Sequence, residues 1–226
     1  MKMIQVAAIA AAGVVLVGCK TEFAAEVPLS TLQDSSMAAI PALARLEVLS
    51  CDHYEDSRQP SDALVKAQEM MPRIFPTAEF SECYQQGMDS WAEFHIALPI
   101  DRDNDPETFA SEDAFNLTTT EDLPLGLAVP PALLQRLEEA QRANMMMGTP
   151  EYAISLKVVN DTDDVFSPTV LAAWANDQPL TLQRVDLSPG EEMIFTLSDV
   201  LIDRAMKNGE ASVLIDFERL LAKRDS

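Results

Sequence analysis

Histidine, cysteine and glycine are scarce in this sequence, and each shortage narrows the possible functions. The 226 residues include only two histidines and three widely separated cysteines, which argues against a metal centre built from imidazole or thiolate ligands. Seven glycines beside 14 prolines exclude a collagen-like or glycine-rich fibrous chain.

Positive charge is also in short supply, because 16 Lys and Arg residues face 37 Asp and Glu residues and leave a formal charge of -21. Proteins that bind nucleic acid neutralise phosphates with a cationic face, so this balance excludes a general DNA or RNA partner. A hydrophobic fraction of 47% with 23% charged residues is nevertheless ordinary, and it predicts a packed core instead of disorder.

Long hydrophobic runs are missing except for one near the N-terminus. It extends from Met3 to Val17, is interrupted only by Gln5, and follows the single cation Lys2. At about 1.5 Å per helical residue the run reaches about 22 Å, which is short of a hydrocarbon core of about 30 Å. This layout predicts a cleaved signal peptide over residues 1–18 in preference to a transmembrane helix.

The run ends in Leu16-Val17-Gly18-Cys19, a segment that resembles the lipobox of bacterial lipoprotein precursors. The resemblance implies recognition of Leu16, Val17 and Gly18 by signal peptidase II, cleavage after Gly18, and a diacylglycerol thioether on Cys19. Two or three acyl chains on Cys19 would anchor the chain stably to a membrane. The alternative is an ordinary signal peptide in which Cys19 stays unmodified.

Lys20 follows the lipobox cysteine. In lipoproteins of enteric bacteria, an Asp at this position usually keeps the protein in the inner membrane. By this resemblance, Lys20 favours the outer membrane. The acidic surface would be repelled by an anionic bilayer, so the charge predicts a body held away from the membrane on a tether.

If Cys19 carries lipid, two cysteines remain, Cys51 and Cys83. In an oxidising compartment this pair predicts one disulfide. A redox-active pair is the alternative, but such pairs are usually spaced Cys-x-x-Cys, so we expect a structural link.

The fold class predicted from the residue patterns is α+β and rich in strands. Residues 19–147 are expected to form an N-terminal sheet with two helices and the disulfide. The helices are expected after Ser61, a good N-cap, as far as Pro72, and after Pro130-Pro131. The strands are expected at 21–29, 44–51, 77–85, 90–100, 114–120 and 123–129.

Residues 148–226 show short strands at close spacing, which predicts a small antiparallel β-sandwich-like region with one helix. Its strands are expected at 152–159, 169–175, 180–187, 192–197 and 211–217, with a helix capped by Ser198 and ended by Gly209. The run Met145 to Pro150 suggests the domain boundary. Because about 78 residues are few for a sandwich, the alternative is one core shared by both halves.

The strongest candidate for a ligand site is an acidic loop containing Asp101, Asp103, Asp105 and Glu112. Oxygen ligands at positions 1, 3, 5 and 12 of a loop suit calcium, and the spacing resembles an EF-hand. Pro106 stands where an EF-hand requires glycine, so a calcium site of another type, or simply a solvated acidic loop, is the remaining interpretation.

Motifs for catalysis are lacking, since the sequence has no nucleophile elbow, phosphate loop or His-Glu-x-x-His. Only His53 and His95 could act as imidazole bases, and His95 is expected to face solvent on its strand. Trp91 and Trp174 could stack on sugars but are expected in the core. A carboxylate pair for glycan hydrolysis stays open, because sequence spacing does not report separation in space.

The overall plan is also similar to small uncharacterised lipoproteins of bacteria, phages and prophages. The likeness rests on Lys20-Thr21-Glu22, Pro28-Leu29-Ser30 and the single pair Cys51 and Cys83. It implies a protein that binds or shields an envelope component.

The expected function is therefore that of a lipid-anchored cell-envelope lipoprotein. We expect it in the outer membrane in preference to the inner membrane. We expect it to act as a non-enzymatic binding, adaptor or shielding module with an envelope protein as partner, and to need no cofactor beyond the lipid on Cys19. The alternatives are an envelope glycan hydrolase and a calcium-ordered adhesion or assembly module.

Overall fold

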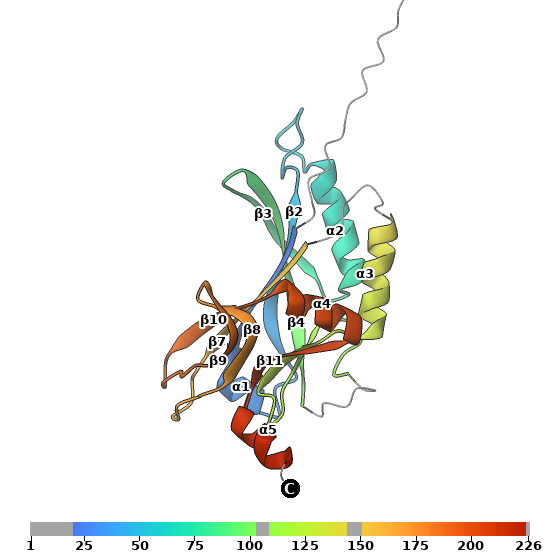
Figure 1. Ribbon diagram of the computed structural model, residues 1–226. Helices are drawn as coiled ribbons and strands as arrows, with labels where there is room; N and C mark the ends of the chain where they lie inside the picture. The colour runs from blue at the N-terminus through green and yellow to red at the C-terminus, as the bar shows by residue number, and fades with distance from the viewer. Residues whose placement is uncertain (1–19, 103–108, 144–150, 225–226) are drawn as a thin grey trace, which may run out of the picture.

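The computed structural model describes residues 20–102, 109–143 and 151–224, which form one closed, strand-rich body (Figure 1). The first half contains β1 (Lys20–Pro28), α1 (Leu29–Gln33), β2 (Ala39–Val48), α2 (Asp62–Ile74), β3 (Glu79–Gln86), β4 (Asp89–Asp101), β5 (Asn116–Thr118), β6 (Leu125–Ala128) and α3 (Pro131–Ala143). The second half contains β7 (Glu151–Val159), β8 (Thr169–Ala175), β9 (Gln178–Arg184), β10 (Glu192–Leu197), α4 (Asp199–Asn208), β11 (Glu210–Ile215) and α5 (Phe217–Arg224).

Nine of these strands close into a mixed β-barrel in the order β10-β7-β1-β2-β4-β5-β6-β11-β8, and a pairing of β8 with β10 completes the ring. The pairs β1–β7 and β4–β5 are parallel, and the others are antiparallel. Two strands lie outside the ring, β3 paired with β4 and β9 paired with β8. Closure removes most of the exposed sheet edges.

The predicted division into an N-terminal sheet and a C-terminal sandwich is wrong. β1 pairs with β7 over nine consecutive residue pairs, from Lys20 with Glu151 to Pro28 with Val159, so strands from both halves build the same barrel. The boundary expected between residues 147 and 148 lies outside the described residues. The prediction of a separate antiparallel sandwich was wrong because local turns predict hairpins between neighbouring strands. A parallel pair between distant segments leaves no such local signal in the sequence.

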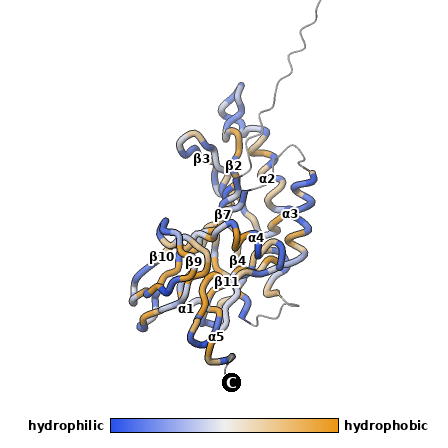
Figure 2. Tube along the Cα trace, in the orientation of Figure 1, coloured by the Kyte–Doolittle hydropathy of each residue, from blue (hydrophilic) through white to orange (hydrophobic). Residues whose placement is uncertain are grey.

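The core fills the barrel and continues under α2 and α3. Phe23 of β1 makes edge contacts with Phe75 and Phe115, at ring-centroid distances of 5.5 and 5.0 Å, and all three side chains are buried. Leu64 and Met71 of α2 are buried in the same cluster. Figure 2 shows apolar residues along the barrel strands and polar residues at many of the loop tips.

The helices begin and end largely where their capping residues predict. The Ser198 side chain accepts a hydrogen bond from the amide of Leu201, and Gly209 ends α4 in the left-handed conformation with φ 84°. α2 begins after Ser61 as expected but continues through Pro72 to Ile74, because a proline in the last turn removes only one amide.

Within the described ranges, no helix is both long and apolar enough to cross a lipid bilayer.

Candidate functional site

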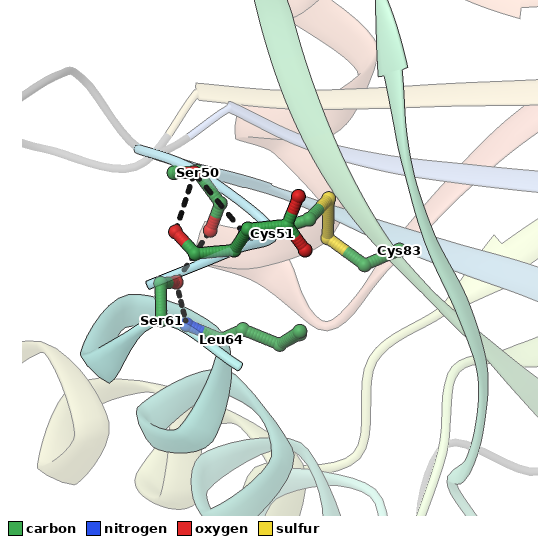
Figure 3. Close-up of a disulfide and its surroundings, with 6 residues drawn as sticks. Ser50, Cys51, Ser61, Leu64 and Cys83 are labelled. Carbon is green, nitrogen blue, oxygen red and sulfur yellow. Dashed lines mark hydrogen bonds between the residues drawn. A yellow bond between two sulfur atoms is a disulfide. The ribbon is translucent and has the colours of Figure 1, made fainter. Parts of the chain in front are cut away.

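The predicted disulfide is present, and it organises one end of the barrel (Figure 3). Cys51 follows β2 and Cys83 lies on β3, with their Cα atoms 5.6 Å apart. The Ser61 amide donates to the Cys51 carbonyl at 3.0 Å, and the Ser61 hydroxyl donates to the Ser50 carbonyl while accepting from the Leu64 amide. The disulfide therefore fixes β3 against the segment from which α2 begins.

A second feature is the hairpin formed by β8 and β9, which projects from the barrel wall beside β10 (Figure 1). Its two-residue turn is Asn176-Asp177, with φ values of 44° and 65° that these residue types tolerate better than most. The Ile194 amide donates to the Asn176 side-chain oxygen at 3.0 Å, and the Asn176 amide donates to the Ile194 carbonyl at 2.9 Å. The turn is thus held against β10.

This hairpin and β10 expose apolar side chains on one outer face, which we call the hairpin patch: Trp174, Pro179 and Ile194. Trp174 and Ile194 are each 45% exposed. Trp174 lies opposite Pro179 on β9 and opposite Thr196 on β10. The two neighbours of Thr196 along β10 are buried, so Ile194, two residues before Thr196, lies on the same outer face as Thr196. Exposed apolar groups that lie together on a rigid wall are typical of protein-binding surfaces.

The edge of the sheet adjoins the hairpin patch. In the part of the chain that the structure describes, β9 pairs with β8 alone. An edge strand presents backbone groups on which another strand can pair, although Pro179 has no amide to offer. Arg184 at the end of β9 contacts Glu218 of α5 at 2.8 Å, which leaves the middle of β9 as the accessible part of this edge.

Of the two tryptophans expected in the core, Trp174 contradicts the expectation and Trp91 is buried as expected. Trp174 is half exposed. Trp91 is buried, but it lies outside the main core cluster and opposite Glu47 and Tyr84 on the neighbouring strands. Pro179 and Ile194 were missed by sequence reasoning, because alternation alone does not show which face of a strand lies inside a barrel.

The predicted calcium ligands divide between described and undescribed parts of the chain. Asp103 and Asp105 lie outside the described residues. Asp101 is buried at the end of β4, whereas Glu112 is exposed and its carbonyl oxygen accepts a hydrogen bond from Arg136. Across the described ranges, no group of three or more His, Cys, Asp or Glu residues is placed to hold a metal ion.

The candidate bases lie on separate parts of the surface. His95 is exposed on β4, which confirms the prediction that it faces solvent. His53 lies in the loop after Cys51, where its Nδ1 accepts from the Glu55 amide at 3.3 Å.

Hydrogen bonds lower the pKa of three carboxyl groups. The donors are Ser36 for Asp34, Arg58 for Asp56 and Ser30 for Asp161. A general acid for glycan hydrolysis needs a raised pKa, so these three carboxyl groups do not suit that role.

The lipobox Leu16-Val17-Gly18-Cys19 lies outside the described residues, and Lys20, the next residue, is the first residue of β1. The Lys20 amide lies 3.4 Å from the Glu47 carboxylate of β2, and Glu47 is buried.

Residues 21–219 match a family described as a domain of unknown function, DUF7424. Neither the curated proteins nor the solved structures contain a match.

Proposed function

The chain belongs to the DUF7424 family, and we propose that it is a lipid-anchored envelope protein that binds another envelope protein without catalysing a reaction. The lipid would be attached to Cys19, and the outer membrane is favoured over the inner membrane as its location. A phage or prophage origin, with a role in shielding an envelope component, is part of the same proposal.

The observation that carries the binding role is the hairpin patch. A chain with 37 acidic and 16 basic residues has ample polar surface, yet Trp174, Pro179 and Ile194 are exposed on one face of this hairpin and its neighbouring strand. Aromatic and aliphatic anchors of this kind contribute most of the affinity in protein interfaces, while a polar rim sets specificity. The fixed turn at Asn176 presents them without a large loss of conformational entropy on binding.

The non-enzymatic role is supported by the distribution of the candidate catalytic groups. His53 lies in a loop at the disulfide end and His95 lies on the wall of β4. The carboxyl groups with a shifted pKa are shifted downward, by hydrogen bonds that favour the charged form.

The lipid anchor is supported by the lipobox Leu16-Val17-Gly18-Cys19. Metabolic labelling with an alkyne fatty acid, followed by density flotation of membranes, tests this part. We expect the full-length chain to carry label and float, and the Cys19→Ala variant to lose both properties. Flotation of unlabelled protein would contradict the lipid anchor.

Binding through the hairpin patch is tested by replacing single residues with a photo-crosslinking phenylalanine in cells. A crosslinker at Trp174 is expected to give one discrete adduct. The matched control is His95, because the strand register places it on the same row around the barrel as Trp174, five strand steps away. Equal adducts at both positions, or none at Trp174, would contradict a specific surface at the hairpin.

A competition experiment identifies what the patch contributes. We expect the Trp174→Ala variant to retain its fold, because half of the side chain is exposed, and to lose the adduct formed from a crosslinker at Ile194. Release of glycan fragments in proportion to added protein would instead support the hydrolase.

A further inference from the structure

Two strands, β3 and β9, form free edges of the sheet in the part of the chain that the structure describes. β3 pairs with β4 alone, and β9 pairs with β8 alone. Figure 1 shows the two strands at well-separated places, β3 near the top of the view and β9 above α5. A free edge presents backbone amides and carbonyls to which an extended segment of another chain can bond.

The two edges differ in the charges that protect them. β3 contains Glu79 and Glu82, both exposed, and charged residues on an edge strand oppose pairing with another chain. β9 contains no acidic residue, and Arg184 is its single charged residue. The Arg184 side chain is paired with Glu218 of α5 at 2.8 Å and lies 3.8 Å from Asp186. β9 is therefore the less protected edge.

The middle of β9 has backbone groups available for bonding. The register of β9 with β8 omits one pair, Ala172 with Thr181. The Ala172 carbonyl instead accepts a hydrogen bond from the amide of Ser198, directly after β10, at 3.3 Å. Thr181 is exposed and, within the described ladder, has no partner on β8. An added strand could satisfy these backbone groups.

Pro179 does not prevent the addition of a strand. Because the hairpin turn has two residues, the flanking pair Ala175 with Gln178 is a hydrogen-bonded pair. The next pair, Trp174 with Pro179, is then of the kind without hydrogen bonds between its members. The amide that proline lacks would face away from β8, so Pro179 costs the hairpin no bond and still offers its carbonyl to the free edge.

We propose that β9 receives an extended segment of the partner protein as an additional strand, and that this segment has aliphatic residues in its middle and basic residues at both ends. The inference rests on the proposed function and names the class of partner that binds beside the hairpin patch. Since Pro179 belongs to both the patch and β9, residues next to an added strand can reach Trp174.

The chemistry of the segment follows from the surroundings of β9. Asp177 is exposed directly before the strand and Asp186 is exposed shortly after it, so acidic residues flank both ends of the edge. Leu182, which is 60% exposed, provides apolar surface between them. Basic residues at the ends of the partner segment complement this arrangement. A second copy of this chain would instead bring the same acidic residues together, which disfavours it.

Binding of a synthetic peptide to the full-length protein in detergent micelles tests the proposal. The probe is fluorescein-labelled Lys-Arg-Val-Thr-Val-Thr-Val-Arg-Lys, and fluorescence anisotropy measures its affinity. Two isomers of the probe carry three N-methyl groups each, one at alternate residues and the other at consecutive residues. Successive amides of an extended strand point to opposite sides, so the first isomer keeps one edge intact and the second keeps neither.

We expect the isomer methylated at alternate residues to bind within about threefold of the unmethylated probe. The isomer methylated at consecutive residues should bind at least about tenfold more weakly, because it loses backbone hydrogen bonds on either edge. A probe with Glu in place of Lys and Arg is expected not to bind. Equal affinities of the two isomers, or no binding of the unmethylated probe, overturn strand addition.

Variants of the edge strands locate the binding site. Thr181→Pro removes an amide without a partner on β8 and should weaken binding of the probe about tenfold, whereas Thr181→Val keeps the amide and should bind as the original protein does. The matched control is Ser81→Pro in the bulge of β3, where Ser81 likewise has no partner on β4, and it should leave the affinity unchanged. Urea denaturation verifies the fold of each variant. If Thr181→Pro does not fold, the two peptide isomers still decide the question.

The crosslinker at Trp174 in cells separates this inference from the proposed function. We expect Thr181→Pro to abolish the adduct and Thr181→Val to retain it. An adduct that Thr181→Pro does not diminish overturns strand addition, while binding at the hairpin patch stands. An adduct of twice the mass of the chain assigns the edge to a second copy and also overturns the proposed partner. Absence of any adduct at Trp174 contradicts the proposed function itself.

Discussion

Arg136 of α3 donates a hydrogen bond from Nε to the carbonyl oxygen of Ile74, the last residue of α2, over 2.9 Å. The same guanidinium donates from Nη2 to the Glu112 carbonyl at 2.8 Å and lies 3.3 Å from the Asp113 carboxylate. One side chain therefore fastens two helices and the segment that precedes β5. Carbonyl groups at the end of a helix have no partner within the helix, which makes Arg136 a cap for α2.

Replacement of Arg136 by methionine tests how much these contacts contribute to the free energy of unfolding. We expect the free energy of unfolding to fall by about 2–4 kcal/mol, because two hydrogen bonds from a charged donor are lost. Urea denaturation followed by circular dichroism measures the change. The control is Arg142→Met, whose exposed ion pair with Glu138 is expected to contribute less than about 0.5 kcal/mol. Equal effects of the two substitutions would refute the fastening role.

The disulfide is expected to contribute more than any other single contact at its end of the barrel. Cys51 and Cys83 are separated by 32 positions, and in the chain-entropy model closing such a loop stabilises the fold by about 3 to 4 kcal/mol. The double variant Cys51→Ala, Cys83→Ala should lose that amount in urea denaturation. Reductant should destabilise the original protein by a similar amount and leave the double variant unchanged, since it has no bond to reduce.

Gly126 of β6 occupies a position with no room for a side chain. A Cβ atom built there would lie 2.4 Å from the Thr118 hydroxyl oxygen and 3.1 Å from the Ala211 carbonyl oxygen. We expect Gly126→Ala to lower the free energy of unfolding by about 1–3 kcal/mol through overpacking. Thr118→Ala in the same chain should recover part of the loss, because it removes the nearer atom. A double-mutant cycle without coupling would exclude this contact as the cause.

Tyr152 is expected to make stability depend on pH in the alkaline range. Burial raises the pKa of its phenol to about 12 from an ordinary value of 10.0. Because the native state holds this proton more tightly than the unfolded state, the contribution is complete below pH 10 and is lost as the pH rises to about 12. Tyr152→Phe should flatten this dependence. Absorbance at 295 nm, which reports tyrosinate, should show Tyr152 ionising last of the three tyrosines.

The Asn176 turn is expected to govern the hairpin patch. Asn176→Ala loses the side-chain hydrogen bond to the Ile194 amide and places alanine at φ 44°, so we expect a cost of about 1–2 kcal/mol. Asn176→Gly removes the bond but suits the backbone, and should cost less. Amide hydrogen exchange at Ile194 should accelerate in both variants. Unchanged exchange would show that the turn is held by other contacts.

Much of the local structure was predictable because it depends on neighbouring residues. The N-caps Ser61 and Ser198 and the C-terminal Gly209 were all recognised from sequence, and each forms as expected. The C-terminal end was not: residues 211–217 were predicted as one strand, but Phe217 begins α5. The closed barrel escaped prediction because the nine-residue parallel pairing of β1 with β7 joins segments that carry no common local signal.

Of the candidate site, only the disulfide could be predicted from the sequence. The pairing of Cys51 with Cys83 followed from elimination, since lipidation of Cys19 would leave two cysteines. The hairpin patch was not found, because Ala173, Trp174 and Ala175 alternate in the same way whether Trp174 faces inward or outward. Only the curvature of the closed sheet decides which face is buried.

The pairing of β1 with β7 also sets the order in which the chain can fold. Lys20 and Glu151 are partners, although 130 residues lie between them. During synthesis, which proceeds from the N-terminus at about 5–20 residues per second, β1 must wait many seconds before β7 exists. Loop closure over such a distance slows folding, as in other proteins of high contact order. Until β7 is made, β1 presents an unpaired edge, and any chaperone that protects the nascent chain has to cover it.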